Sequence, residues 1–318
     1  MEKINKFLLF SQFIDNINKD LLGGIYLMKF IKYETKKEFL EENLSELLNE
    51  EAKNEIMIGI TLEHSEEKVN KWLMGRIEEG GSIKLIFLVD DDKEGLLVYS
   101  PEPVIQDKVI EFLIDNIISL NIKLREVLTS IQNSERIAEV YSKKTNTEMK
   151  KGEIVQIFKF DKFNEEHILK SGEKLEKIEK EQELEKIENN VKEMYKDTYH
   201  GAYCSDEEAN KVAKIFIKKG LYVLRNERNE IVSQAVTVRK QVNSIAIGGV
   251  ITPERFRGNG YAKRCVYALC EKLLKDGYKF IVLHVNSKNQ PAISVYKRIG
   301  FEQIDETRKI KFSLDIEN

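Results

Sequence analysis

A loop that combines two glycines with two arginines is the part of the chain best suited to chemistry. It runs from Thr252 to Ala262 (TPERFRGNGYA), between an expected strand, Ser244 to Ile251, and an expected helix, Tyr261 to Leu274. Glycines allow successive backbone N–H groups to close on a ligand, and the first turn of a helix offers unpaired N–H groups and the positive end of its dipole to an anion. Arg255 and Arg257 can add charge-assisted hydrogen bonds. The pattern therefore predicts a phosphate or pyrophosphate site.

Two other phosphate-binding loops do not fit this segment. A Walker loop requires Gly-Lys-Ser/Thr at the start of the helix, whereas this chain has Gly260-Tyr261-Ala262. A Rossmann loop requires three glycines within a βαβ unit, whereas here two glycines follow an expected meander of hairpins. The arrangement Arg255-x-x-Gly258-x-Gly260 instead resembles the R-x-x-G-x-G/A signature of the GNAT superfamily of N-acetyltransferases, whose loop holds the pyrophosphate of acetyl-coenzyme A.

A second pattern downstream strengthens the resemblance. Lys279 to Val285 (KFIVLHV) predicts a buried strand, and a helix is expected to begin near Asn289 and to end at Gly300. A helix that starts with Asn-x-x-Ala, carries Tyr296 and is followed by Gly-Phe resembles the second GNAT signature. The resemblance covers about residues 221–314.

The resemblance implies a fold, a co-substrate and a set of site residues. The fold would be the α/β (α+β) GNAT type, a mixed, mostly antiparallel twisted sheet flanked by helices, and the co-substrate would be acetyl-CoA, with no metal. Tyr296 would be the general acid for the leaving thiolate; a core aromatic residue is the alternative. Asn289 is equally well interpreted as a helix cap. The residues expected to bind the cofactor are Val250, Ile251, Thr252, Arg255, Arg257, Gly258, Asn259, Gly260, Tyr261, Ala262 and Asn289.

The strand before the loop and the histidines leave some roles open. Gly248 and Gly249 inside the strand predict a bulge or a close approach of the ligand, with close helix packing as the alternative. In GNAT folds this strand splays from its parallel neighbour. No general base stands out: His200 fits an ordinary loop residue, and His284 fits a hydrogen-bonded core histidine. A carboxylate from the helices that border the acceptor is as plausible.

The two halves of the chain show a similar expected order of helices and strands. Residues 137–143 (IAEVYSK) also resemble residues 292–298 (AISVYKR) at an offset of 155. We therefore predict tandem copies, a degenerate GNAT-like domain over 28–155 and a catalytic GNAT domain over 156–318. The alternative is an unrelated α/β domain in the N-terminal half.

The N-terminal copy lacks the phosphate-binding loop. At the matching place the chain reads Pro101-Glu102-Pro103, where prolines donate no N–H and a carboxylate repels phosphate. This half is therefore predicted not to bind coenzyme A, and to complete the substrate pocket or stiffen the catalytic half.

Within the second copy, the segment Lys170 to Asp197 is rich in Glu and Lys, with apolar residues mostly at helical spacing. It predicts an amphipathic helix packed on the sheet, with a lid over the acceptor site as the alternative.

Composition sets outer limits on function. Of the 318 residues 42% are hydrophobic, and 51 Lys and Arg nearly balance 54 Asp and Glu, so net charge gives no support for nucleic-acid binding. No apolar run is long enough to span a membrane. Cys204, Cys265 and Cys270 lack metal-ligand spacing and fit core thiols in a reducing cytosol, which predicts a cytoplasmic protein. The abundance of Lys, Ile and Asn suggests an AT-rich bacterial genome.

The first 27 residues raise a separate hypothesis. Gly23 and Gly24 would correspond to a ribosome-binding sequence shortly before Met28. Residues 1–27 would then be a leader extension before a natural start at Met28, and an ordinary amphipathic N-terminal helix is the alternative.

Together these patterns favour an acetyl-CoA-dependent N-acetyltransferase. It would transfer the acetyl group to a primary amine of a small molecule or peptide by direct attack, and act as a monomer or homodimer. The alternatives are a tandem-GNAT aminoacyl or acyl transferase and a non-catalytic, coenzyme A-binding regulatory module.

Overall fold

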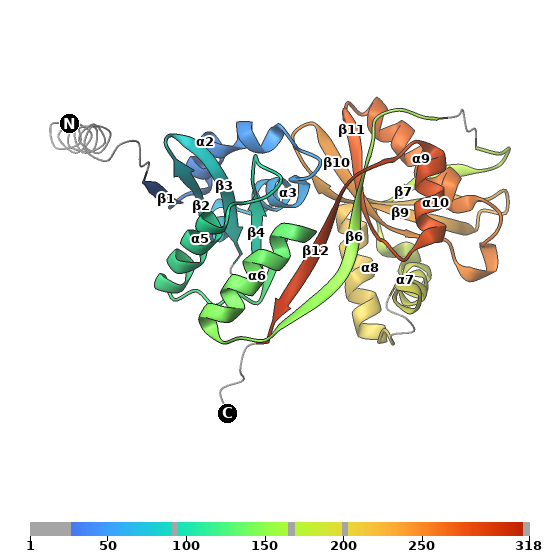
Figure 1. The fold of residues 1–318 in the computed structure, drawn as a ribbon. Coiled ribbons are helices and arrows are strands. Elements are labelled where there is room, and N and C mark those ends of the chain that lie inside the picture. Colours follow the sequence, from blue (N-terminus) through green and yellow to red (C-terminus); the bar gives the residue numbers. More distant parts are fainter. Residues whose placement is uncertain (1–26, 91–94, 165–168, 199–202, 314–318) are drawn as a thin grey trace. The chain divides into compact units, whose positions relative to one another are not determined.

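The computed structural model describes residues 27–90, 95–164, 169–198 and 203–313 (Figure 1). Nearly all of the expected leader, and the loop residue His200, lie outside these ranges. Within them, no helix combines the length and the apolar character needed to cross a membrane.

The chain forms two compact units that exchange segments. The N-terminal unit takes in the chain up to Asn43, Glu66–Lys151 and the end from Lys309, and the C-terminal unit takes in Leu44–Ser65 and Gly152–Arg308. The expected division at residue 155 follows the order of the chain, whereas each unit also includes a piece of the other half. The elements that run across the unit boundaries are α2 (Lys36–Leu48), β6 (Met149–Phe160) and β12 (Glu302–Phe312).

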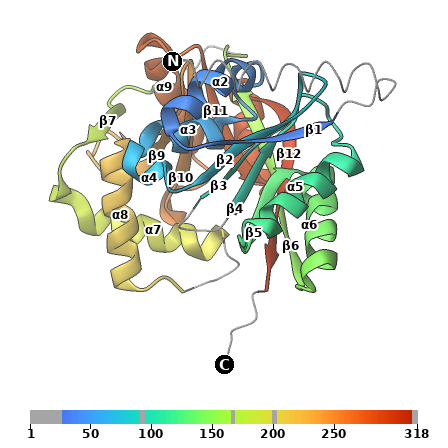
Figure 2. The ribbon, with the colours of Figure 1, turned by 90° about the vertical axis from the view of Figure 1, so that its left-hand side faces the viewer.

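The N-terminal unit is a sheet with helices packed against it. Its other elements are β1 (Met28–Tyr33), α4 (Glu66–Val69), β2 (Leu73–Glu79), β3 (Ser82–Val89), β4 (Gly95–Tyr99), α5 (Asp107–Ser119), β5 (Glu126–Ser130) and α6 (Ile131–Thr145). The strands follow the order β1-β2-β3-β4-β5, and the end of β12 lies next to β5. Strands β4 and β5 are parallel, whereas β1–β2, β2–β3 and β3–β4 are antiparallel. Helices α5 and α6 lie side by side (Figure 2), and their residues Leu113 and Ile137 are buried in the core of the N-terminal unit.

The C-terminal unit repeats this plan. Its other elements are α3 (Glu55–Glu63), β7 (Lys174–Ile178), η1 (Glu181–Glu183), α7 (Leu184–Thr198), α8 (Asp206–Gly220), β8 (Leu221–Arg225), β9 (Ile231–Lys240), β10 (Ser244–Ile251), η2 (Glu254–Phe256), α9 (Tyr261–Lys275), β11 (Phe280–Asn286) and α10 (Gln290–Ile299). The strands follow the order β7-β8-β9-β10-β11-β6-β12. Strands β10 and β11 are parallel, whereas β7–β8, β8–β9, β9–β10 and β6–β11 are antiparallel.

Helices cover both faces of the sheet in the C-terminal unit. Along β8, Tyr222 and Leu224 belong to the core formed with α9 and α10. The alternating residues Leu221 and Val223 belong to the core formed with α7 and α8. Because successive strand residues point to opposite faces, the two helix pairs lie on opposite sides of the sheet.

The predicted fold class and the tandem arrangement are confirmed. In each unit an antiparallel meander leads through a helix (α5 or α9) to a parallel strand and then through a second helix (α6 or α10) to a long last strand. The two resembling segments, 137–143 and 292–298, lie in the equivalent helices α6 and α10. The last strands are exchanged: β6 pairs with β11 of the C-terminal unit, and the end of β12 reaches β5, where the Phe312 N–H donates to the carbonyl of Arg125 over 2.8 Å.

The single helix predicted over Lys170 to Asp197 is wrong. The segment begins with strand β7, continues through η1 and becomes helical only from Leu184. Leu175 and Ile178 are three residues apart, which imitates helical spacing, but β7 pairs along its length with β8 as an edge strand. This pairing with a strand more than 40 residues away overrides the local pattern. Strands β1 and β2 were not expected from the sequence.

A segment of the N-terminal half holds the start of β10 within the C-terminal unit. The buried carboxylate of Glu51 accepts hydrogen bonds from the backbone N–H of Asn243 at 2.8 Å and from the hydroxyl of Ser244 at 2.8 Å. One turn later, Glu55 is fully buried and pairs with both nitrogens of one edge of the Arg239 guanidinium, at 2.8 and 2.6 Å. The residues 44–65 are therefore an integral part of this unit.

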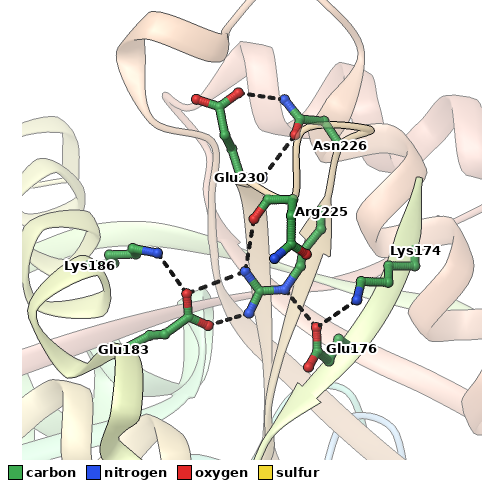
Figure 3. Close-up of polar contacts among 8 residues, drawn as sticks. Lys174, Glu176, Glu183, Lys186, Arg225, Asn226 and Glu230 are labelled. Carbon is green, nitrogen blue, oxygen red and sulfur yellow. Dashed lines mark hydrogen bonds and ion pairs between the residues drawn. The ribbon is translucent and has the colours of Figure 1, made fainter. Parts of the chain in front are cut away.

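A buried arginine joins β7 and η1 to the end of β8 (Figure 3). Arg225 is 5% exposed, and its guanidinium contacts the carboxylates of Glu176 and Glu183 and donates to the carbonyl of Asn229 over 3.2 Å. Lys186 adds a second cation to Glu183 at 2.8 Å. A buried guanidinium needs such partners because charge is costly to remove from water. The cluster fixes the chain where it leaves β7 and enters α7.

We expect Glu183→Gln to weaken this cluster in a pH-dependent way. Hydrogen bonding by Arg225 lowers the pKa of Glu183 from 4.5 to about 2. Since the folded-state pKa is lowered, the stabilisation is complete above pH 4.5 and is lost as the pH falls towards 2. The variant should lower the free energy of unfolding by about 1–3 kcal/mol at neutral pH and by much less near pH 2, measured by urea unfolding. Exposed Glu185→Gln is the control; an equal loss in both variants at neutral pH would contradict this role.

Candidate functional site

The site begins where two parallel strands stop pairing. Strands β10 and β11 are paired from Ser244 and Phe280 up to Ile247 and Leu283, and β11 continues to Asn286 without a partner in β10. A gap between parallel strands exposes backbone N–H and C=O groups that a ligand can use. The splay expected of this strand is therefore present.

A glycine bulge turns β10 away from its neighbour. Opposite β9, the register moves from Gly248 and Val236 to Ile251 and Gln234, so two residues of β10 face one of β9. Gly249 has φ +55°, and a Cβ added there would lie 3.0 Å from Val236 and 3.1 Å from Phe216 of α8. Both interpretations of the glycine pair hold, since Gly249 provides a left-handed bulge and also a close helix contact.

The loop after β10 presents an open, glycine-lined start of α9. Gly258 and Gly260 have φ of +78° and +73°, and a Cβ added at Gly258 would meet no atom within 4 Å. Gly260 precedes the first helical residue, Tyr261, and has no side chain with which to cap the first turn. The N–H groups and dipole of a 15-residue helix therefore face the loop, which favours an anion at this point.

A cavity of about 760 Å³ lies between this loop, β10 and α10. Its volume falls in the range of sites for small molecules and cofactors. The predicted residues that line it are Val250, Ile251, Thr252, Arg257, Gly258, Gly260, Tyr261, Ala262, Asn289 and Tyr296. The structure thus brings together two sequence patterns separated by almost 30 residues.

The two loop arginines have different positions. Arg257 lines the cavity, donates from Nε to the carbonyl of Thr252 over 3.0 Å, and pairs through Nη2 with Asp197 of α7 at 2.6 Å. Arg255, the arginine of the signature, is exposed, stacks on the ring of Phe256 at 4.8 Å and is not among the residues that line the cavity. Arg257 is therefore the loop cation placed to meet an anion in the cavity.

Asn259 supports the loop from outside the cavity lining. Its side-chain amide donates to the carbonyls of Phe256 and Arg257, each over 3.1 Å. The Asn259 carbonyl accepts from Arg264, which pairs with Glu173 through two hydrogen bonds of 2.8 Å. These contacts hold the glycine backbone in one conformation.

The residues of α10 close the cavity on the other side. The side chain of Asn289 accepts from the N–H of Ala292 over 3.2 Å and also lines the cavity, so it is a helix cap at the edge of the site. Tyr296 lies two turns further along, is 7% exposed and belongs to the core with Phe301. Burial raises the pKa of the Tyr296 phenol, so it stays protonated at neutral pH.

Several lining residues are absent from the sequence prediction. Lys263, Lys288 and Arg298 bring further positive charge to the cavity. Lys263 directly follows the loop and could have been included from its place in the first turn of the helix. Asn286 ends β11 beyond the split, and Asp197 arrives from α7, so only the tertiary structure reveals them.

The remaining candidate groups lie outside the cavity. All three cysteines are free and buried, and burial raises the pKa of Cys265 to about 12, in keeping with core thiols. No group of three or more metal-ligating side chains occurs in the described part of the chain. His284 lies on β11 beside Glu55, and burial lowers the pKa of its imidazole.

Comparisons with known proteins agree with this geometry. Residues 224–310, from β8 into β12, match the FR47-like protein family. An uncharacterized N-acetyltransferase, YycN, from Bacillus subtilis is 38% identical over 52 residues, which are 16% of this chain and 33% of that protein. The match therefore spans about a third of the relative's length.

Solved structures extend the likeness to both units. A GCN5-related N-acetyltransferase from Sphaerobacter thermophilus has a TM-score of 0.53 at 12% identity, covering 90% of this chain and 95% of its own. A Drosophila protein has a TM-score of 0.54 at 13% identity, covering 94% of each chain. At such identities the likeness concerns the fold.

Both units of the chain have a GNAT-like fold. In the C-terminal unit, the FR47-like match over residues 224–310 adds sequence similarity to this fold, and the N-terminal unit is a second, degenerate GNAT-like fold.

We expect Gly258→Asp to abolish anion binding at the loop. The new carboxylate would enter the open space at the start of α9 and repel a phosphate there. In calorimetric titration with inorganic pyrophosphate, the Kd should rise at least about tenfold. Gly277→Asp is a matched control, because Gly277 also has a positive φ (+100°) and no atom within 4 Å of an added Cβ. A similar weakening by both variants would place the anion elsewhere.

Proposed function

We propose that the protein is an acetyl-CoA-dependent N-acetyltransferase whose acceptor is a primary amine of a small molecule or a peptide. The observation that carries the proposal is the cavity that joins the glycine loop, the splayed edge of β10 and the helix of Tyr296 in one unit. A pyrophosphate at the loop would leave the rest of an extended ligand to run along β10 towards Tyr296.

The residues present fit acetyl-CoA by chemistry as well as by volume. The start of α9 and Arg257 provide N–H groups and positive charge for the pyrophosphate. Lys263, Lys288 and Arg298 are further cations for phosphate groups. Val250 and Ile251 offer apolar contact to the pantetheine arm and the thioester, and the edge of β10 at Val250 is open to a ligand because β10 has left β11 at this point.

The reaction proposed is direct attack of the amine on the thioester carbonyl. The N–C bond forms, the C–S bond breaks, and negative charge develops first on the carbonyl oxygen and then on sulfur. A backbone N–H of the splayed part of β10 would stabilise the oxygen. The Tyr296 phenol, which burial keeps protonated, would donate a hydrogen bond or its proton to the leaving sulfur.

The N-terminal unit is proposed to take no coenzyme A. In the place of the glycine loop, Glu102 pairs with Lys84 at 3.5 Å, and Asp107 supplies a negative charge in the first turn of α5. A carboxylate already occupies the helix start that would otherwise attract phosphate. Its contribution would be to shape and support the transferase unit.

We therefore expect one acetyl-CoA to bind per chain. Calorimetric titration should give a stoichiometry near one and a micromolar Kd, and Gly258→Asp should remove the binding whereas Gly277→Asp retains it. Two sites per chain would contradict the proposed role of the N-terminal unit, and no binding by the wild-type protein would contradict the transferase proposal itself.

We expect Tyr296→Phe to slow turnover without weakening acetyl-CoA binding. The ring, and with it the packing against Phe301, remains, and only the proton donor is lost. Thiol release should fall about 10- to 100-fold in kcat, with the calorimetric Kd for acetyl-CoA within twofold of wild type. Tyr278→Phe, at the turn before β11, is the control. If kcat were unchanged, Tyr296 would be a core aromatic residue only.

A further inference from the structure

His284 lies at the point where the strands part. Leu283 is the last residue of β11 that is paired with β10, so His284 is the first residue beyond this pairing. On its other side, His284 is paired with the apolar Ile157 of β6. Leu283 and Val285 point into the core with α9 and α10, so His284 points to the opposite face. Asn286, two residues on and on the same face, lines the cavity. The Cα atom of His284 therefore lies about 7 Å along β11 from that of Asn286, a residue that lines the cavity.

A buried carboxylate from the N-terminal half stands beside this imidazole. Nε2 of His284 lies 3.1 Å from Oε1 of Glu55, which is itself fully buried and held by Arg239 through two hydrogen bonds. Nε2 is buried and has no hydrogen bond of good geometry among the described residues. About 20% of the His284 side chain is exposed, and this exposure belongs to the other ring atoms.

The charges around His284 suit a base rather than a permanent cation. Burial is the largest influence on the imidazole and lowers its pKa below 6.5. The two charged groups that face it act in opposite directions, since Glu55 on α3 raises this pKa and Arg239 on β9 lowers it. The ring is therefore neutral near pH 7. A carboxylate beside Nε2 favours the tautomer with the proton on that nitrogen, which leaves Nδ1 as the proton acceptor.

We propose that His284, oriented by Glu55, is the general base that takes the proton from the acceptor amine. The inference rests on the proposed function, because an alkylammonium must lose a proton before its nitrogen can attack. That proton passes to Nδ1, directly or through one water, and the freed lone pair forms the N–C bond as the C–S bond breaks. The second proton released by nitrogen ends on sulfur. His284 then returns its proton to solvent, so the products are the amide, the thiol and one proton.

His284→Gln tests the proposal by kinetics. With the best acceptor among spermidine, tyramine and trialanine, kcat/KM near pH 7 should fall about 100-fold. The calorimetric Kd for acetyl-CoA should stay within twofold. The loss should shrink about tenfold per pH unit towards the pKa of the acceptor amine, about 10 for an alkyl amine and about 8 for the N-terminus of trialanine, because the free amine then needs no base. The control is His64→Gln, which changes a histidine at the end of α3, the helix that carries Glu55. A rate equal to wild type, or one lowered equally at every pH, would overturn the proposal.

A second measurement does not depend on the acceptor. Nitrogen-15 NMR of the four histidines, with His284 assigned from the His284→Gln spectrum, reports which ring nitrogen carries the proton. The proposal requires a neutral ring protonated on Nε2 near pH 7, and a lower pKa in Glu55→Gln because a neighbouring negative charge is removed. A charged ring, or the opposite tautomer, would overturn it even if none of the three amines is acetylated. Absence of acetyl-CoA binding would count against the proposed function instead.

Discussion

The left-handed backbone of Gly249 is the constraint on which the site depends. It bulges β10 against β9, and β10 then leaves β11 after only four paired residues. The cavity, the exposed edge of β10 and the approach to the glycine loop all follow from that departure. A Cβ at Gly249 would lie 3.0 Å from Val236 and 3.1 Å from Phe216 of α8, so the bulge and the close packing of α8 both favour glycine at this position. A sheet paired along its full length would leave no room for an extended ligand between these strands.

Local sequence was sufficient for the parts of the site that are continuous in the chain. The loop of Gly258 and Gly260, the strand before it and the helix of Tyr296 each carry turn, capping or periodicity signals within a dozen residues. The glycine pair in β10 indicated a bulge for the same reason, since glycine adopts a left-handed backbone without the steric cost that a Cβ brings. Two patterns in a fixed order also identified the fold class, which neither short pattern could do alone.

The contacts that local sequence could not provide are those between distant segments. Glu55 and Arg239 are 184 residues apart, and the local sequence around either residue does not predict their ion pair. Strand β7 forms because it pairs with β8, although the spacing of its apolar residues imitates that of a helix. The signature arginine shows the same limit. Arg255 matches the family pattern, yet Arg257 reaches the cavity, because the short helix η2 directs the two side chains differently.

The exchange of last strands has a consequence for how such a chain can evolve. After a gene duplication, a copy that loses its ligand-binding loop is ordinarily free to decay and disappear. Here the C-terminal unit uses β6 and residues 44–65, and the N-terminal unit uses the end of β12, so neither half encodes a complete sheet. Selection on the intact copy therefore preserves the other as well. Mutation can erase the chemistry of the first half while the chain retains its architecture.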